Sequence, residues 1–120
     1  MKTLFKQYLS NKNIDFKIES LNVISFIYRQ HHYLMIHEEE DPNYFCICLP
    51  DVEDSNSITD DIRTKMNQIS REYKVAKLIE VDDHVWITAE TFVFNYVGIQ
   101  SLFDRLISLL DRVIIDYHSR

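Results

Sequence analysis

Hydrophobic and polar residues alternate along some stretches of this chain and recur at helical spacing along others. Between residues 14 and 20 every second side chain is apolar, which predicts a strand with one buried face. Ile58, Ile62, Met66, Ile69 and Tyr73 instead fall on one side of a helix, which predicts a helix lying on a sheet. The whole pattern predicts helices over residues 2–11, 57–73 and 99–117, and strands over residues 14–20, 22–29, 32–38, 44–49, 75–81 and 84–94.

These elements follow the order α-β-β-β-β-α-β-β-α, which places the fold in the α/β (α+β) class. Strands in hairpin-connected runs pair antiparallel, so we expect one antiparallel β-sheet flanked by helices. Residues 44–49 are apolar on both faces and are predicted to form a central strand. The pattern leaves open whether residues 22–29 and 32–38 are two arms of a hairpin or one bent strand. With 120 residues and no linker or repeat, the sequence indicates a single domain over residues 1–120.

The sequence contains one glycine, Gly98, and this scarcity excludes several kinds of site. A GxGxxG dinucleotide loop, a GxxxxGK phosphate loop and a GxSxG nucleophile elbow all require more than one glycine. We expect Gly98 to lie where the chain leaves the last strand and turns into the last helix. Asp82 and Asp83 are predicted to form the tight turn between the last two strands. Ser57, with Asp60 three residues later, is predicted to cap the middle helix.

The chain is acidic. It has 19 Asp and Glu against 13 Lys and Arg, and its formal net charge is -6. Binding to phosphates needs a positive surface, so we expect neither a nucleic acid nor a membrane as partner. No apolar run approaches the roughly 20 residues of a membrane span. Both cysteines lie within one apolar run, which is typical of a reducing compartment, and we expect a cytoplasmic protein.

Residues 66–110 carry a resemblance to a known family. The stretch begins with an apolar-Asn element at 66–70, and Lys77 then leads into a strand. After this strand come the acidic turn, the return strand at 85–90 and a final helix of Leu and Phe repeats. This arrangement resembles the YbjN-like family of bacterial proteins, whose fold is similar to that of type III secretion chaperones. His84 stands where the family often has a glycine. The resemblance implies a chaperone-like domain without known catalysis, often dimeric, that acts in protein binding or sensory regulation.

Cys46 and Cys48 are the first candidates for chemistry. Alternation puts both thiols on the same face of a strand, where parallel Cβ directions disfavour a disulfide. Two thiolates can supply half of a tetrahedral zinc site, and the remaining ligands could come from His31, His32 and His37. In the other interpretation both cysteines are small buried apolar residues, which is the common state of free cysteine.

Two acidic clusters are further candidates. Within residues 37–41, His37 is followed by four consecutive carboxylates, but a calcium loop spaces its ligands at alternate positions and needs a glycine, so we interpret this stretch as a solvated turn. The second cluster lies in a loop and a first helical turn, where acids favour the helix dipole: Asp51, Glu53, Asp54, Asp60 and Asp61. No nucleophile there has a base nearby in sequence, so we expect neither an enzyme nor a cofactor.

The last helix is the strongest candidate for an interaction surface. Its apolar residues span about 160° of arc, whereas a helix covering one sheet face needs about 100°. Trp86 is predicted to point away from the helices, and tryptophan is enriched at interface hot spots. The predicted interaction surface therefore comprises Trp86, Phe103, Leu106, Leu110, Ile114 and Tyr117.

The sequence thus predicts a non-catalytic protein-binding or regulatory module of chaperone-like type. We expect it to form a homodimer and to bind a protein or peptide. The alternative is a small Cys/His metal-binding or redox protein centred on Cys46 and Cys48.

Overall fold

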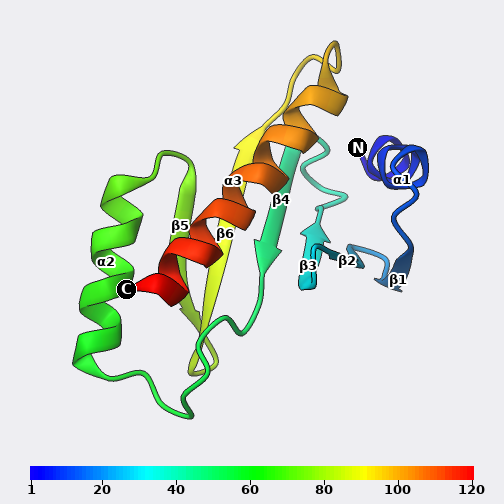
Figure 1. Ribbon diagram of the computed structural model, residues 1–120. Helices are drawn as coiled ribbons and strands as arrows, with labels where there is room; N and C mark the ends of the chain where they lie inside the picture. The colour runs from blue at the N-terminus through cyan, green and yellow to red at the C-terminus, as the bar shows by residue number, and fades with distance from the viewer.

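The computed structural model describes all 120 residues and contains three helices and six strands. The predicted element order is confirmed (Figure 1). The elements are α1 (Lys2–Asn11), β1 (Phe16–Ser20), β2 (Val23–Tyr28), β3 (His31–Ile36), β4 (Tyr44–Leu49), α2 (Asp60–Glu72), β5 (Ala76–Val81), β6 (His84–Phe92) and α3 (Ile99–Ser119).

All six strands form one antiparallel sheet in the order β1-β2-β3-β4-β6-β5. β4 lies inside the sheet between β3 and β6, as its two apolar faces predicted, and every residue from Phe45 to Leu49 is buried. Residues 22–29 and 32–38 form a hairpin, because Arg29 and Gln30 both adopt positive φ angles of 50° and 70°. Asp82 and Asp83 have similar angles, so both hairpins are closed by two-residue turns that match the strand twist.

The helices cover one face of the sheet and leave the other face without a helix. In Figure 1, α3 runs diagonally across the sheet with α2 beside β5 on one side and α1 on the other. The inward residues Val85, Ile87 and Ala89 of β6 are fully buried, as predicted from alternation. An aromatic cluster joins α1 to the sheet and α3, with the rings of Phe5 and Phe103 edge to face at 4.9 Å.

Two local features of the sequence determine where helices begin. The predicted cap at Ser57 is wrong: Thr59 caps α2, and its side-chain oxygen accepts a hydrogen bond from the amide of Ile62 at 3.2 Å. Ser57 lies two residues too early, since the first helical residue is Asp60. Gly98 precedes α3 in the left-handed region, with φ of 74°, which confirms its expected place at the turn into the last helix.

No helix is both long enough and apolar enough to cross a membrane.

Candidate functional site

The structure changes the role expected of five residues in the predicted interaction surface. Their side chains lie in the core of the single chain, at 0–5% exposure, and only Leu106 among them also borders a surface groove: Phe103, Leu106, Leu110, Ile114 and Tyr117. The wide apolar arc of α3 arises because this helix packs against the sheet, α1 and α2 at once. Periodicity gives the width of the arc but not the neighbours that cover it. Trp86 is half-buried on the helix-free face, as predicted.

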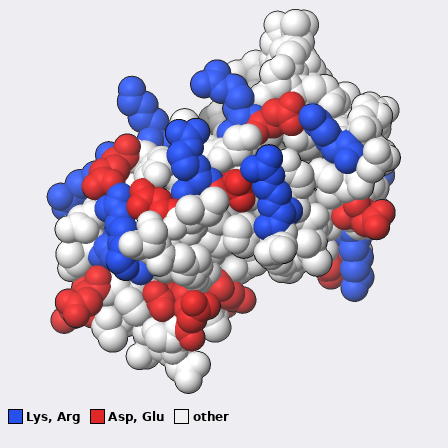
Figure 2. Space-filling view, in the orientation of Figure 1, with Lys and Arg blue, Asp and Glu red and all other residues white.

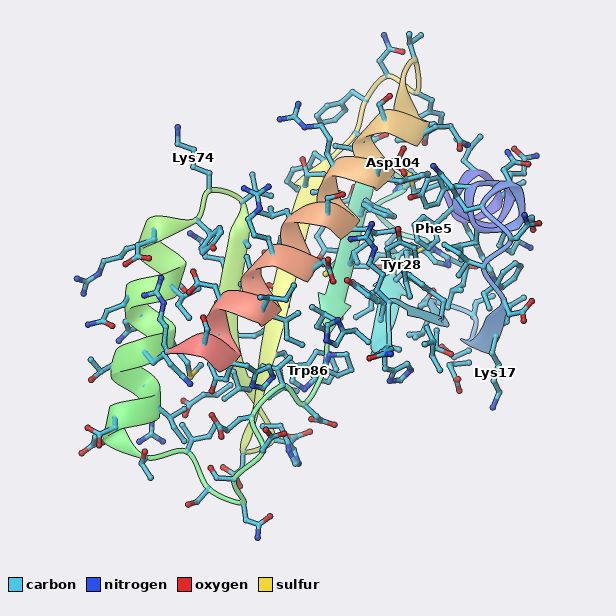
Figure 3. All side chains as sticks on the ribbon, in the orientation of Figure 1. Phe5, Lys17, Tyr28, Lys74, Trp86 and Asp104 are labelled. Atoms are coloured by element: carbon cyan, nitrogen blue, oxygen red, sulfur yellow. The ribbon has the colours of Figure 1, made fainter.

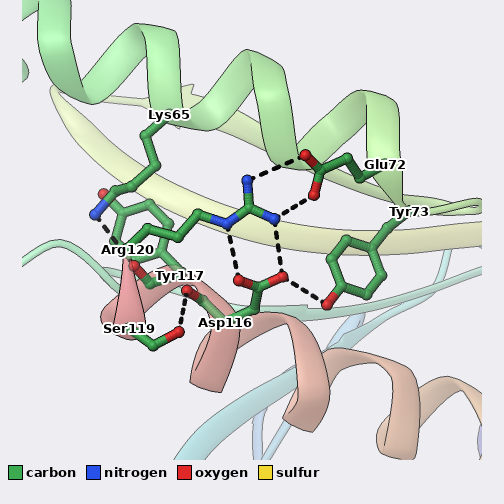
Figure 4. Close-up of polar contacts among 7 residues, drawn as sticks. All are labelled: Lys65, Glu72, Tyr73, Asp116, Tyr117, Ser119 and Arg120. Atoms are coloured by element: carbon green, nitrogen blue, oxygen red, sulfur yellow. Dashed lines mark hydrogen bonds and ion pairs between the residues drawn. The ribbon is translucent and has the colours of Figure 1, made fainter.

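The C-terminal end of α3 is fixed to α2 by a polar cluster (Figure 4). The Arg120 guanidinium donates to both Asp116 and Glu72, and Tyr73 donates to Asp116 at 2.7 Å. The hydrogen bond from Arg120 is the main cause that holds the pKa of both carboxyl groups below their usual values. Lys65 donates to the carbonyl of Tyr117 at 3.2 Å and so satisfies one of the carbonyls left open at the helix end.

Every acidic side chain of α3 is compensated by a group from elsewhere in the fold. Asp104 accepts a 2.6 Å hydrogen bond from the Tyr8 hydroxyl on α1, and Lys12 lies 3.4 Å away. Asp111 accepts from Arg29 of the β2–β3 turn at 3.2 Å. Asp116 is held by Arg120 and Tyr73, as described above. The three negative charges of the helix are therefore already paired within the protein.

The arginines within α3 have no such partners. Arg105 and Arg112 are exposed, and neither takes part in an ion pair or a side-chain hydrogen bond, although acidic residues outnumber basic ones in this chain. They are seven residues apart, which places them on the same side of the helix about 10.5 Å apart along its axis. Lys74, in the turn between α2 and β5, is likewise unpaired and projects from that turn in Figure 3.

These three cations line one groove of about 540 Å³ between α3 and the turn that joins α2 to β5. Its apolar lining comes from Val75, Leu102, Leu106 and Leu109, and Ser108 adds a hydroxyl. Asp104 also lines the groove, but its carboxylate is turned to the α1 side, where Tyr8 and Lys12 bind it (Figure 3). Figure 2 shows Lys and Arg side chains across the upper and central part of this face, with Asp and Glu side chains interspersed among them and more acidic side chains at its lower left. We refer to this feature as the α3 groove.

The α3 groove was missed by sequence reasoning because its signal is weak. A spacing of seven between Arg105 and Arg112 places both on one helix side, but their significance depends on the acidic neighbours being paired elsewhere. Those pairings join residues that are far apart in sequence, such as Arg29 and Asp111. Only the tertiary structure shows which charges remain free.

The cysteine pair does not meet the predicted histidines. Cys46 and Cys48 point to the helix-free face and are buried there at 5% and 0% exposure. On the adjacent strand β3 their register partners are Ile36 and Leu34, not histidines. No group of three or more His, Cys, Asp or Glu side chains is arranged to hold a metal ion. A hydrogen bond between the thiols lowers the pKa of Cys46, and the same bond together with burial raises that of Cys48.

The second acidic cluster makes structural contacts. Asp51 lies 3.4 Å from His84, and Glu53 accepts hydrogen bonds from the Tyr117 hydroxyl and the Ser55 amide. Asp60 and Asp61 occupy the first turn of α2, as the dipole argument predicted. The Ser55 hydroxyl donates to the carbonyl of Ser57, so it is not directed at a base.

Comparison with known proteins shows the fold. No protein-family model matches the chain, and no curated protein matches it in sequence. Among solved structures, the chain is similar to YbjN from E. coli, described as a proposed transcription regulator, with a TM-score of 0.68. The similarity covers 99% of this chain and 92% of that one at 11% sequence identity. The chain therefore has the YbjN fold, as the family resemblance implied.

Proposed function

We propose that this protein is a non-catalytic, cytoplasmic protein-binding module of chaperone-like or regulatory type. Its binding surface is the α3 groove, and its ligand is an acidic amphipathic segment of a partner protein. The observation that carries this proposal is the selective pairing of charges on α3. All three acids of the helix are compensated internally, while Arg105 and Arg112 are left free beside an apolar lining.

The chemistry of the α3 groove favours a peptide over other ligands. A nucleic acid presents a continuous row of phosphates, and three cations in a chain of net charge -6 compensate few of them. A peptide can place a few carboxylates on the cations and apolar side chains on Leu102 and Leu109. The role as regulator proposed for YbjN is compatible with such protein contacts, since a regulator can act through a bound protein.

The spacing of the cations defines the ligand further. The spacing of Arg105 and Arg112 along α3 matches that of two glutamates seven residues apart on a partner helix. In each helix the two side chains are separated by two turns and lie on the same side. Leucines on the same side of that helix would pack on the apolar lining of the groove. This arrangement is a helix-in-groove mode of recognition.

A direct test uses a fluorescently labelled amphipathic peptide in which glutamates recur at every seventh position beside leucines. Fluorescence anisotropy is measured on titration with wild-type protein and with the double variant Arg105→Gln/Arg112→Gln. We expect binding by the wild type and roughly tenfold weaker binding by the variant, which corresponds to about 1.4 kcal/mol for two exposed ion pairs.

The matched control is Lys6→Gln/Lys77→Gln, which removes the same charge from two unpaired lysines outside the groove. This control should bind as the wild type does. Equal weakening by both double variants would mean that only the overall charge matters, and it would refute the α3 groove as the binding site.

A further inference from the structure

Ser108 lies at the centre of the α3 groove, between the two free arginines. It contributes the one hydroxyl group of the groove lining, and its side chain is exposed. It follows Arg105 by three residues and precedes Arg112 by four. Residues three and four apart are neighbours on a helix surface, so both arginines flank Ser108 on one side of α3. A group held above Ser108 is therefore open to both guanidinium groups, one from each end.

The protein supplies no anion of its own at this position. All three acids of α3 are bound elsewhere, including Asp104, the one acid in the groove lining, which accepts a hydrogen bond from Tyr8. Lys74 adds a third cation from the other side of the groove, where it projects from the turn between α2 and β5 (Figure 3). None of the three cations forms an ion pair. The centre of the groove thus offers three cations and a hydroxyl to one anionic group.

A phosphoryl group matches this set of donors more closely than a single carboxylate does. Phosphoserine carries a charge of about -2 at pH 7 and three strong acceptor oxygens, whereas a glutamate carries a single negative charge. The planar guanidinium of arginine donates paired N–H groups in a geometry that suits phosphate, and arginine clusters recur in proteins that recognise phosphorylated segments. One phosphoryl group has enough oxygens to accept from both arginines and from the serine hydroxyl.

We propose that the partner segment bound in the α3 groove carries a phosphorylated serine or threonine, whose phosphoryl group lies over Ser108. Arg105 and Arg112 then donate to its oxygens from the two sides, the Ser108 hydroxyl donates from the helix surface, and Lys74 lies across the groove. This inference rests on the proposed function, because it names the group that the same groove recognises. It adds a condition to that function, since phosphorylation of the partner then controls how tightly the partner binds.

The test compares three labelled amphipathic peptides that differ at one residue, which is serine, phosphoserine or glutamate. The glutamates of the peptide described above are replaced by glutamine, and the variable residue lies midway between two of them on the same side of the helix. Fluorescence anisotropy should show that phosphoserine binds about tenfold more tightly than glutamate, because a further hydrogen bond to a charged group contributes at least this factor. The serine peptide should bind most weakly.

The pH dependence of binding gives a second measurement. The second pKa of a phosphate monoester is about 6, so the phosphoserine peptide should bind more weakly as the pH falls through this value. The glutamate peptide should change little over the same range, because no histidine lines the groove. A parallel decline of both peptides would argue against a phosphoryl group as the recognised feature.

Two variants of Ser108 test where the phosphoryl group binds. Ser108→Asp places a carboxylate between the two arginines and should abolish the preference for phosphoserine. The matched control is Ser101→Asp, seven residues earlier on the same side of α3, since Ser101 is also exposed but lies outside the groove lining. This control should bind the phosphoserine peptide as the wild type does. Ser108→Ala preserves the helix and should weaken the phosphoserine peptide about twofold to threefold through loss of one hydrogen bond.

Equal affinity for the phosphoserine and glutamate peptides would overturn the proposal, as would equal weakening by Ser108→Asp and Ser101→Asp. If the original peptide with several glutamates still binds in that case, only the phosphoryl assignment fails. If that peptide does not bind either, the proposed function fails with it. Displacement of the phosphoserine peptide by a short single-stranded DNA at equal phosphate concentration would assign the groove to a nucleic acid, and it would also overturn the proposal.

Discussion

Arg105 and Arg112 lie two turns apart on the same side of α3, and neither side chain meets a carboxylate. The acids of the same helix are bound from α1, from the β2–β3 turn and from the helix C-terminus. The fold therefore separates the charges of α3 into paired acids and free cations. This separation gives an acidic protein a local cationic groove.

The hydrogen bond between Tyr8 and Asp104 should contribute measurably to stability. Tyr8→Phe removes the 2.6 Å bond from the hydroxyl to the carboxylate but keeps the buried ring. We expect a loss of about 1.5 kcal/mol in the free energy of unfolding, the lower end for a hydrogen bond to a charged group. Urea denaturation measures this loss. Tyr96→Phe is the control and should change nothing, because the Tyr96 side chain is exposed and makes no hydrogen bond. Equal stability of both variants would contradict the prediction.

Phe103 is expected to be a core residue and not a contact for a partner. Phe103→Ala should destabilise the protein by about 3–5 kcal/mol, because it leaves a cavity among Phe5, Tyr8 and Phe45. Leu102→Ala, one position earlier and half-buried at the α3 groove, should cost much less. Thermal unfolding of the two variants measures the difference. Similar melting temperatures would show that the ring of Phe103 is not packed as described.

The effect of replacing Gly98 should come from backbone strain alone. A Cβ at this position meets nothing within 4 Å, but φ is +74°. Gly98→Ala should therefore cost about 1–2 kcal/mol, the penalty of a left-handed conformation for an L-residue. Gly98→Asn should be tolerated better, because asparagine adopts this region more readily. Chemical denaturation of both variants is the measurement, and an alanine variant as stable as the wild type would contradict it.

The cluster around Arg120 should make stability depend on pH in the acid range. The pKa values of Asp116 and Glu72 are lower in the folded protein than their ordinary values of 3.8 and 4.5. The unfolded chain therefore takes up protons first as pH falls, so the contribution is complete above these ordinary values and is lost as pH falls from them through the lower pKa values of the folded protein. Arg120→Ala should lower stability at neutral pH and flatten its decline in acid. Denaturation curves recorded at several acid pH values give the free energy of unfolding of the wild type and of Arg120→Ala. If this free energy falls equally steeply with pH in both proteins, Arg120 does not stabilise the charged forms of Asp116 and Glu72.

Much of the fold could be predicted because local pattern determines it. The element order, the central position of β4, the turn at Asp82 and Asp83, and the place of Gly98 all follow from nearby residues. The cap of α2 was misplaced by two residues because Ser57 and Thr59 are both suitable capping residues, and only one lies next to the first turn.

The binding surface could not be predicted in the same way. The apolar arc of α3 looked too wide for one sheet, yet α1 and α2 cover the excess. The cations that remain free are defined by long-range pairs such as Tyr8 with Asp104 and Arg29 with Asp111. No local spacing encodes these pairs, so the α3 groove emerges only when the elements are assembled.

The most direct test of the proposed α3 groove is an exchange of charges across the complex. Arg105→Glu/Arg112→Glu is titrated with two labelled peptides, one carrying the glutamates described above and one with lysines at the same positions. We expect this variant to bind the lysine peptide and no longer the glutamate peptide, whereas wild-type protein should show the opposite preference. If wild-type and variant proteins bind both peptides alike, the cations of the α3 groove do not select the partner and the proposed function is contradicted.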